Sequence, residues 1–294
     1  MTTAAEARSG KSHRDENFPV ASRLIRPEHR APILAFYDFV RAADDVADHA
    51  TLPPAEKLAL LDGLEAALLG SGPPDPAAEP LRRQLAARKL SPKHAQDLLD
   101  AFRLDVRKNR YADWAELIHY CSLSAMPVGR FVLDVHGESR ERTWPTSDAI
   151  CAALQIINHL QDCGKDFRNL DRVYLPLDTL AEHGARVEDL GATKATPALK
   201  AAIAALAVRT QGLLEEGKPL PRQIAYTRLA LEIAAIVGLA GTLVAGLRTR
   251  DPLSEKVHFS KAGFLATGLA AAVGTLARRL LAKPHPAAQP ARSR

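Results

Sequence analysis

The feature that most limits the fold of this chain is a helical pattern that continues from segment to segment without alternating strands. Alanine and leucine dominate the sequence, and aromatic residues make up only 5% of it. That balance favours helix over sheet, because β-branched and aromatic side chains are the ones that sheets prefer. No repeat of fixed period and no interior linker interrupts the pattern. The sequence therefore predicts an all-α protein with a single helical domain.

The expected elements follow from Pro, Gly and capping residues. We expect a polar, disordered tail over 1–16, a helical domain over 17–282, and a second disordered tail over 283–294. The Gly- and Pro-rich segment 70–80 predicts a loop, and 168–180 a connection. Helices are predicted over 27–49, 53–69, 80–90, 92–107, 111–137, 147–167, 195–216, 221–247 and 259–282.

Charge and cysteine content narrow the functional class. The net charge of +5 is mild and spread out, without the basic block or aromatic-basic interleaving of a nucleic-acid-binding protein. Three scattered cysteines make no disulfide framework, and the polar N-terminus is no secretory signal, so we expect a cytoplasmic protein. The apolar run 229–247 is long enough to cross a bilayer, but its Ala/Gly content and Glu232 favour a buried core helix.

The first predicted helix carries an acidic stripe. Tyr37, Arg41, Asp44 or Asp45, and Asp48 return to one face at about 100° per residue. Asp44 and Asp48 are i,i+4 neighbours that can reach one ion together, and they repel each other when no cation is present.

A later helix carries a second acidic stripe at the same kind of spacing. Gln155, Asn158, Asp162 and Asp166 share one face, and apolar residues surround the beginning of this stripe. Since an unpaired buried charge is costly, this stripe needs a partner. A single such motif is usually a solvated acidic face, whereas two of them in apolar sequence favour a binding site.

All-oxygen ligands of this kind suit Mg²⁺, which commonly bridges carboxylates to phosphate oxygens. No His/Cys cluster has zinc spacing, and His49, His159 and His183 are isolated, so we treat them as surface or core residues. Carboxylate-held metal could stabilise a departing diphosphate, and an apolar helical cavity could hold the resulting carbocation. Arg41 and Arg172 are candidate diphosphate clamps, although either could instead form a salt bridge with an acidic stripe.

At these residues the chain resembles the head-to-head prenyl synthases, which comprise squalene, phytoene and dehydrosqualene synthases. The resemblance covers about residues 16–260 and rests on four segments in the family order. These segments are the two acidic stripes, the run Arg172 to Pro176, and a third segment that includes Tyr120, Cys121, Ala125, Val128 and Gly129. The resemblance implies an isoprenoid synthase-type helical bundle around a central apolar cavity.

The chain departs from the family pattern at a few positions. Gln161 and Lys165 stand where the family has Arg and Glu, and Met126-Pro127 breaks an Ala-Gly pair. The segments 16–22, 43–49 and 124–130 are similar to the hydroxysqualene synthase branch of bacterial hopanoid biosynthesis. That similarity implies presqualene diphosphate as substrate, with water quenching the cation to give hydroxysqualene.

The resemblance also implies roles for individual residues. Two or three Mg²⁺ ions would be held by Asp44, Asp48, Asn158, Asp162 and Asp166, with Asp45 as a further catalytic aspartate. Tyr37, Arg41, Arg172 and Tyr174 would orient the diphosphate, Tyr120 and Gln155 would lie near the cation, and Ser124 and Gly129 would shape the wall. No Rossmann motif for NADPH is visible, and no NADPH is expected.

Two alternatives stay open from sequence alone: a condensing synthase that makes presqualene diphosphate, squalene or phytoene, and a non-catalytic prenyl-lipid-binding relative. The retained aspartates of both stripes argue against the second. A lipid-like substrate implies peripheral contact with the inner face of the cytoplasmic membrane, and contact with other enzymes of the hopanoid pathway is a further expectation.

Overall fold

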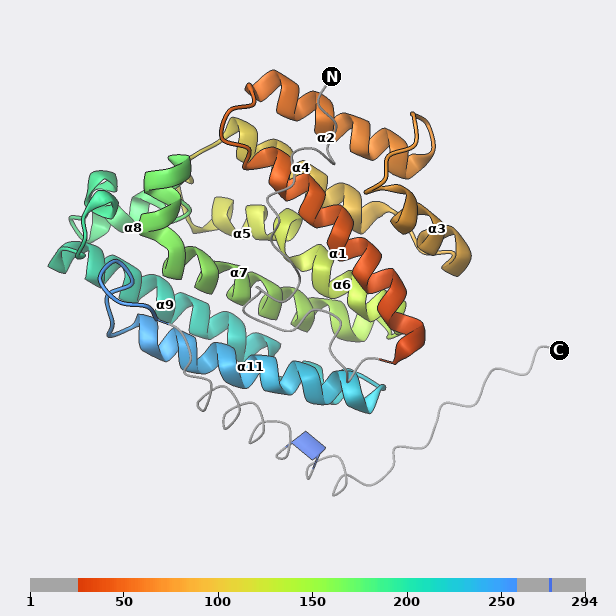
Figure 1. The fold of residues 1–294 in the computed structure, drawn as a ribbon. Helices are drawn as coiled ribbons and strands as arrows, with labels where there is room; N and C mark the ends of the chain where they lie inside the picture. Colours follow the sequence, from red (N-terminus) through yellow and green to blue (C-terminus); the bar gives the residue numbers. More distant parts are fainter. Residues whose placement is uncertain (1–25, 258–274, 277–294) are drawn as a thin grey trace.

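The computed structural model describes residues 26–257 and 275–276, and the regular elements of this part are helices. Figure 1 shows them as a bundle, and the all-α prediction is confirmed. Between Arg110 and Val173 there is one isolated bridge. The elements are α1 (Pro27–Ala47), α2 (Pro54–Leu69), α3 (Glu79–Arg88), α4 (Lys93–Arg107), α5 (Trp114–Ser124), α6 (Met126–Val135), α7 (Arg140–Leu170), α8 (Leu177–Glu182), the 3₁₀ turn η1 (Val187–Gly191), α9 (Pro197–Gly217), α10 (Leu220–Gln223) and α11 (Thr227–Leu247).

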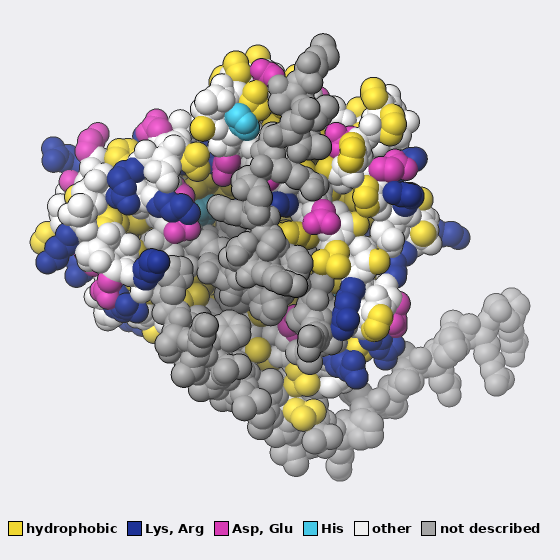
Figure 2. All heavy atoms as spheres, in the orientation of Figure 1, with side chains coloured by type: hydrophobic (Ala, Val, Ile, Leu, Met, Phe, Trp, Pro, Cys, Tyr) yellow, Lys and Arg dark blue, Asp and Glu magenta, His cyan; other side chains and the backbone are white. Residues whose placement is uncertain are grey.

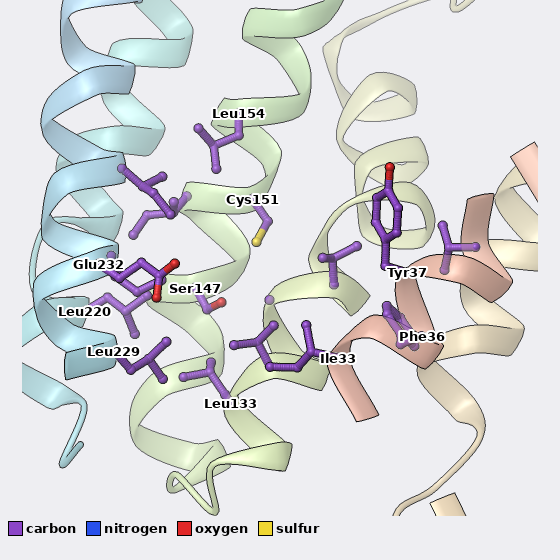
Figure 3. A pocket seen from close by; sticks show the side chains of 17 residues that line it. Ile33, Phe36, Tyr37, Leu133, Ser147, Cys151, Leu154, Leu220, Leu229 and Glu232 are labelled. Atoms are coloured by element: carbon purple, nitrogen blue, oxygen red, sulfur yellow. The ribbon is translucent and has the colours of Figure 1, made fainter. Parts of the chain in front are cut away.

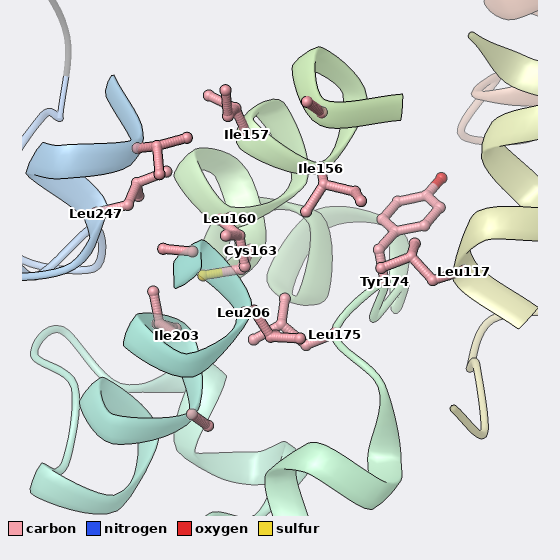
Figure 4. Close-up of a cluster of buried hydrophobic side chains, with 14 of the residues drawn as sticks. Leu117, Ile156, Ile157, Leu160, Cys163, Tyr174, Leu175, Ile203, Leu206 and Leu247 are labelled. Atoms are coloured by element: carbon pink, nitrogen blue, oxygen red, sulfur yellow. The ribbon is translucent and has the colours of Figure 1, made fainter. Parts of the chain in front are cut away.

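The long helix α7 lies at the centre and packs against α6 on one side and α9 on the other, with α11 against both α7 and α9 (Figure 1). On the opposite side of the bundle, α1 packs on α3 and α4, and α2 covers α4. Two large apolar clusters follow this division. One joins α5, α7, α9 and α11 around residues such as Leu160 and Leu206 (Figure 4), and the other joins α1 to α4 around Phe39 and Leu61.

The predicted helix 111–137 is wrong as one element, because the chain forms α5 and α6 with a break at Ala125. Ala125 leaves helical geometry, with φ −129° and ψ −46°. Pro127 then occupies the first turn of α6, where its missing N–H costs nothing. The outer ends of the predicted element are close to those observed, since α5 begins at Trp114 and α6 ends at Val135. Asp113 accepts a hydrogen bond from the Glu116 N–H, and Gly137 adopts a φ of +69°.

Two other predicted boundaries are wrong. The central helix starts at Arg140 and not at Ser147, so that Pro145 lies inside it, and it continues to Leu170. The predicted helix 221–247 is divided into the short α10 and the long α11 by the extended residues around Ile224. In both places packing against neighbouring helices overrides local sequence signals.

In the described residues, α11 is the one helix whose length and composition would allow it to cross a membrane. It also packs on α7, α9 and α10, and residues such as Leu239 and Val244 are buried, which fits the predicted core helix. The predicted tails 1–16 and 283–294 and the predicted helix 259–282 lie outside the described residues, apart from Thr275 and Leu276.

Candidate functional site

The first acidic stripe lies at the C-terminal end of α1. Arg41 donates from Nη1 to Oδ2 of Asp44 at 2.6 Å and from Nη2 to Oδ1 of Asp45 at 3.2 Å. Burial, followed by the charge of Asp48, raises the pKa of Asp44 to about 7. Asp45 is buried and Asp48 is half-exposed. Burial and the neighbouring carboxylates thus disfavour the charged form of Asp44, and a cation would relieve that cost.

The second acidic stripe lies on the C-terminal half of α7 and faces the first. Burial raises the pKa of Asp166 to about 7, and Asp162 and Asp48 raise it further, whereas Lys165 opposes them. The charge of Asp48 therefore acts on carboxyls of both stripes, on Asp44 in its own helix and on Asp166 across the fold. Helices that are far apart in the sequence bring the two stripes within electrostatic reach of each other.

The donor set fits Mg²⁺ in chemistry. Within 26–257 and 275–276, no three His, Cys, Asp or Glu side chains converge closely enough to hold one ion by themselves. Mg²⁺ does not require such a cage, since it usually binds through one or two carboxylates, several waters and substrate phosphates. Carboxylates on two facing helices, with a raised pKa at Asp44 on one and at Asp166 on the other, match that mode of binding.

Arg172 connects the acidic stripes to a buried aromatic group. It follows α7 and is itself buried, and it donates from Nη1 to Oδ1 of Asp48 at 2.5 Å. Two residues later, the Tyr174 hydroxyl donates to Oδ1 of Asp105 at 3.0 Å, and the Tyr120 hydroxyl donates to Oδ2 of the same carboxylate at 2.8 Å. Burial raises the pKa of Asp105 to about 6, against the lowering effect of Arg172 and both tyrosines.

His159 completes this aromatic group. Its ring stacks on Tyr174 with centroids 3.6 Å apart and an interplanar angle of 17°. Burial and the charge of Arg172 lower the pKa of His159 to about 3, so that the ring is neutral at physiological pH. The prediction of a surface or core histidine is thus resolved in favour of the core, beside the acidic site.

An apolar cavity of about 260 Å³ lies between α1, α6, α7 and α11. Figure 3 shows Phe36 and Tyr37 of α1 on one side and Leu229 and Glu232 of α11 on the other, with Leu154 of α7 between them. Two of the lining residues approach the acidic stripes closely: Val40 precedes Asp44 by one helical turn, and Leu154 precedes Asn158 by one turn. Along each helix, the last residue that lines the cavity therefore lies about 6 Å, one turn, before the polar residue.

The structure distributes the predicted site residues over three places. Arg41, Asp44, Asp45, Asp48, Asp162, Asp166 and Arg172 form the acidic region, and Tyr120 and Tyr174 meet at Asp105. Tyr37 and Gly129 line the cavity, but Tyr120, Ser124 and Gln155 are not among its lining residues. Ser124 is near the end of α5, and Gln155 and Asn158 are on α7 between the cavity and Asp162.

Gly129 is required where α6 meets α7. A Cβ at this position would lie 2.5 Å from both Cys151 Sγ and Ser147 Oγ, closer than atoms can pack. Gln161, which stands where the family pattern has Arg, also has a hydrogen-bond partner. Its Nε2 donates to the carbonyl of Val257. Lys165 lies beside Asp162 at a polar surface pocket of about 240 Å³.

Sequence reasoning missed Asp105 and gave Glu232 no functional role. Asp105 continues the buried face of α4 that Leu98, Ala101 and Phe102 begin, so a charge on an apolar stripe was the available signal. Glu232 is buried and is the one charged side chain lining the cavity in the described part of the chain. The sequence shows that Glu232 lies inside an apolar run, but it does not show which residues of other helices surround it.

The face drawn in Figure 2 carries Lys/Arg and Asp/Glu side chains of both signs interspersed around its margin. The described part of this face has no single basic field, in keeping with the mild net charge of +5.

Comparison with known proteins places this geometry in a family. The squalene/phytoene synthase family model matches residues 11–262. Hydroxysqualene synthases from Rhodopseudomonas palustris and Zymomonas mobilis are 58% and 48% identical, covering 98% and 93% of this chain and 99% and 92% of theirs. The crystal structure of squalene synthase HpnC from Alicyclobacillus acidocaldarius is similar with a TM-score of 0.70 and 32% identity, over 83% of this chain and 91% of that one. This chain belongs to the squalene/phytoene synthase family.

Proposed function

We propose that this chain is a hydroxysqualene synthase, which ionises presqualene diphosphate and captures the carbocation with water. The observation that carries the proposal is a pair of acidic stripes on α1 and α7, close enough for the charge of Asp48 to act on both, one helical turn beyond the residues that line an apolar cavity. The full-length similarity to hydroxysqualene synthases supports this choice within the family.

Asp44 and Asp48 on one side, and Asp162 and Asp166 with Asn158 on the other, would hold two or three Mg²⁺ ions. When bound, Mg²⁺ would neutralise the charge that develops on the departing diphosphate. The residues fit this group because Asp44 and Asp166, one in each stripe, have raised pKa values when no cation is present.

Arg41 and Arg172 would bind the diphosphate beside the metals. Tyr37 would orient it directly, and Tyr174 would do so through the segment that it shares with Arg172. Both arginines already bind aspartates of the first stripe. A guanidinium carries five N–H donors, so each arginine can hold a carboxylate and a phosphate oxygen at once.

The reaction needs no reductant. The C–O bond to the diphosphate breaks, and its electron pair leaves with the diphosphate. The cyclopropane of the resulting cation rearranges, and one of its C–C bonds breaks as a water oxygen forms the new C–O bond. The water loses a proton, giving hydroxysqualene and diphosphate. An apolar cavity limits the number of waters that reach the cation, which is what a single defined product requires. We therefore propose that the enzyme works without NADPH.

A peripheral position on the inner face of the cytoplasmic membrane would suit a substrate with two long prenyl chains. The apolar face of the substrate, and not a membrane-spanning segment, motivates this part of the proposal. Contact with enzymes that supply and consume these lipids would keep them out of water.

The decisive experiment incubates the purified protein with presqualene diphosphate and Mg²⁺, with and without NADPH, and identifies the products. We expect hydroxysqualene and diphosphate in both cases. If the protein instead condenses two farnesyl diphosphates at a comparable rate, the alternative of a condensing synthase is correct. If neither substrate reacts and the protein only binds prenyl diphosphate, it is a non-catalytic relative.

A further inference from the structure

Asp105 is a buried carboxylate outside both acidic stripes. It lies on α4, yet its hydrogen-bond donors come from α5 and from the segment that follows α7, 15 and 69 residues away in sequence. A buried charge is tolerated only when several donors and a counter-charge compensate it. Tyr120, Tyr174 and the nearby Arg172 supply that compensation.

The two hydrogen bonds fix the direction of both hydroxyl protons. Each tyrosine has one O–H, and each O–H is donated to a different oxygen of Asp105. The two hydroxyl oxygens lie 3.4 Å apart. With their protons committed, these oxygens are available only as acceptors. A water that donates to them keeps its own lone pairs free for an electrophile.

The ring of Tyr174 and the segment that carries it are also fixed by contacts. Tyr174 stacks on His159 on one face, and its ring centroid lies 5.6 Å from that of Tyr111. The segment carrying Tyr174 is pinned to the chain after α4, because Val173 N–H donates to Asn109 O and Leu177 N–H donates to Tyr111 O, both at 2.9 Å.

The same segment carries Arg172, which binds Asp48 of the acidic site. Asp105 is therefore attached, through Tyr174, to the backbone that places the arginine. It is also close enough to the first stripe for its charge to affect the pKa of Asp44. Through Arg172, the acceptor pair thus lies next to the acidic site from which a diphosphate would leave.

We propose that Asp105 is a positioning residue, which holds Tyr120 and Tyr174 as hydrogen-bond acceptors beside the acidic site and thereby directs water capture of the cation. This inference rests on the proposed function. Asp105 acts through the tyrosines and undergoes no covalent change itself. Its removal should alter turnover and product partition while leaving substrate affinity nearly unchanged.

The test compares Asp105→Asn, the double variant Tyr120→Phe/Tyr174→Phe, and the triple variant, each assayed with presqualene diphosphate and Mg²⁺. Asn keeps the shape but donates where Asp accepts, so we expect kcat to fall about tenfold and the hydroxysqualene fraction to fall, with KM within about twofold. In the double-Phe background, Asp105→Asn should have little further effect, because residues that act as a unit are not additive.

Asp97→Asn is the matched control. Asp97 is another buried aspartate of α4, but it pairs with Lys93 and touches neither tyrosine, so its replacement should leave the product partition unchanged. Circular dichroism and thermal melting check that every variant folds. If Asp105→Asn does not fold, the double-Phe variant alone must still lower the hydroxysqualene fraction.

Additive effects of the two changes would overturn the proposal, as would double-Phe or Asp105→Asn proteins with unaltered kcat and product partition. A wild-type enzyme that condenses farnesyl diphosphate would instead refute the proposed function. The coupling between Asp105 and the tyrosines could then still be measured on the diphosphate that the enzyme does ionise, so the two failures are distinguishable.

Discussion

The acidic region and the apolar cavity are built from the same two helices, α1 and α7, but from opposite ends. The earlier residues of each helix line the cavity, among them Phe36 and Leu154, and the later residues carry the aspartates. In both helices, the residues that line the cavity thus come before the aspartates in the sequence. One end is suited to a lipid chain and the other to a diphosphate, and a shift of either helix would misplace both.

The two regions also differ in what maintains them. The walls of the cavity are mostly apolar side chains, and the burial of such side chains favours the folded state. In the acidic region, burial and then the charges of neighbouring carboxylates raise the pKa values of Asp44 and Asp166. Regions whose local energetics are unfavourable without a ligand are the expected places for function.

The largest effect should come from neutralising an aspartate in each stripe. We expect Asp44→Asn or Asp162→Asn to lower the rate of diphosphate release about 10²–10³-fold, because each removes stabilisation of charge in the transition state. The measurement is released diphosphate at saturating Mg²⁺. Asp62→Asn, at an exposed residue that pairs with Arg103 on the surface, should keep full activity. Unchanged activity in both stripe variants would show that the stripes are not catalytic.

A substitution beside the cavity should change the stability of the protein. Gly129→Ala forces a Cβ against Cys151 and Ser147, so we expect a loss of about 1–3 kcal/mol in the free energy of unfolding. Gly63→Ala is the control. Its Cβ would meet nothing within 4 Å, and alanine favours helix, so it should stabilise the protein by about 0.5–1 kcal/mol. Chemical denaturation measures both, and a neutral Gly129→Ala would contradict the close approach of α6 and α7.

The smallest effect concerns pH and again separates the two regions. Since the folded-state pKa of Asp44 is raised from 3.8 to about 7, the folded protein binds this proton more tightly than the unfolded chain does. Its contribution to stability is full below pH 3.8 and is lost as pH rises toward 7. Without divalent metal, Asp44→Asn should therefore gain thermal stability relative to the wild type between pH 4 and pH 8.

Comparison with the wild type at each pH cancels the effects of other groups, such as the lowered pKa of His159, which has the opposite sign. Mg²⁺ with diphosphate should reduce the relative gain, because a bound cation stabilises the charged carboxylate. If the difference in melting temperature does not vary with pH, the pKa of Asp44 is not raised in the folded protein.

Much of the fold could be predicted from helical patterning, although element boundaries could not. The central helix is predicted to begin at Ser147, yet α7 begins at Arg140 and runs through Pro145. Thr143 and Ser147 are buried on its inner face, whereas Pro145 is exposed on its outer face. The predicted helix boundaries were wrong where burial against distant parts of the chain outweighed local sequence signals.

The sequence by itself determined the helical class, the two acidic stripes and the family, because these depend on residue type and on spacing within one helix. Only the tertiary structure decided that the charge of Asp48 reaches Asp166, that Tyr120 and Tyr174 share Asp105, and that Glu232 lines the cavity. These relations join residues far apart in the chain, and periodicity within a helix carries no information about which face of another helix will lie opposite.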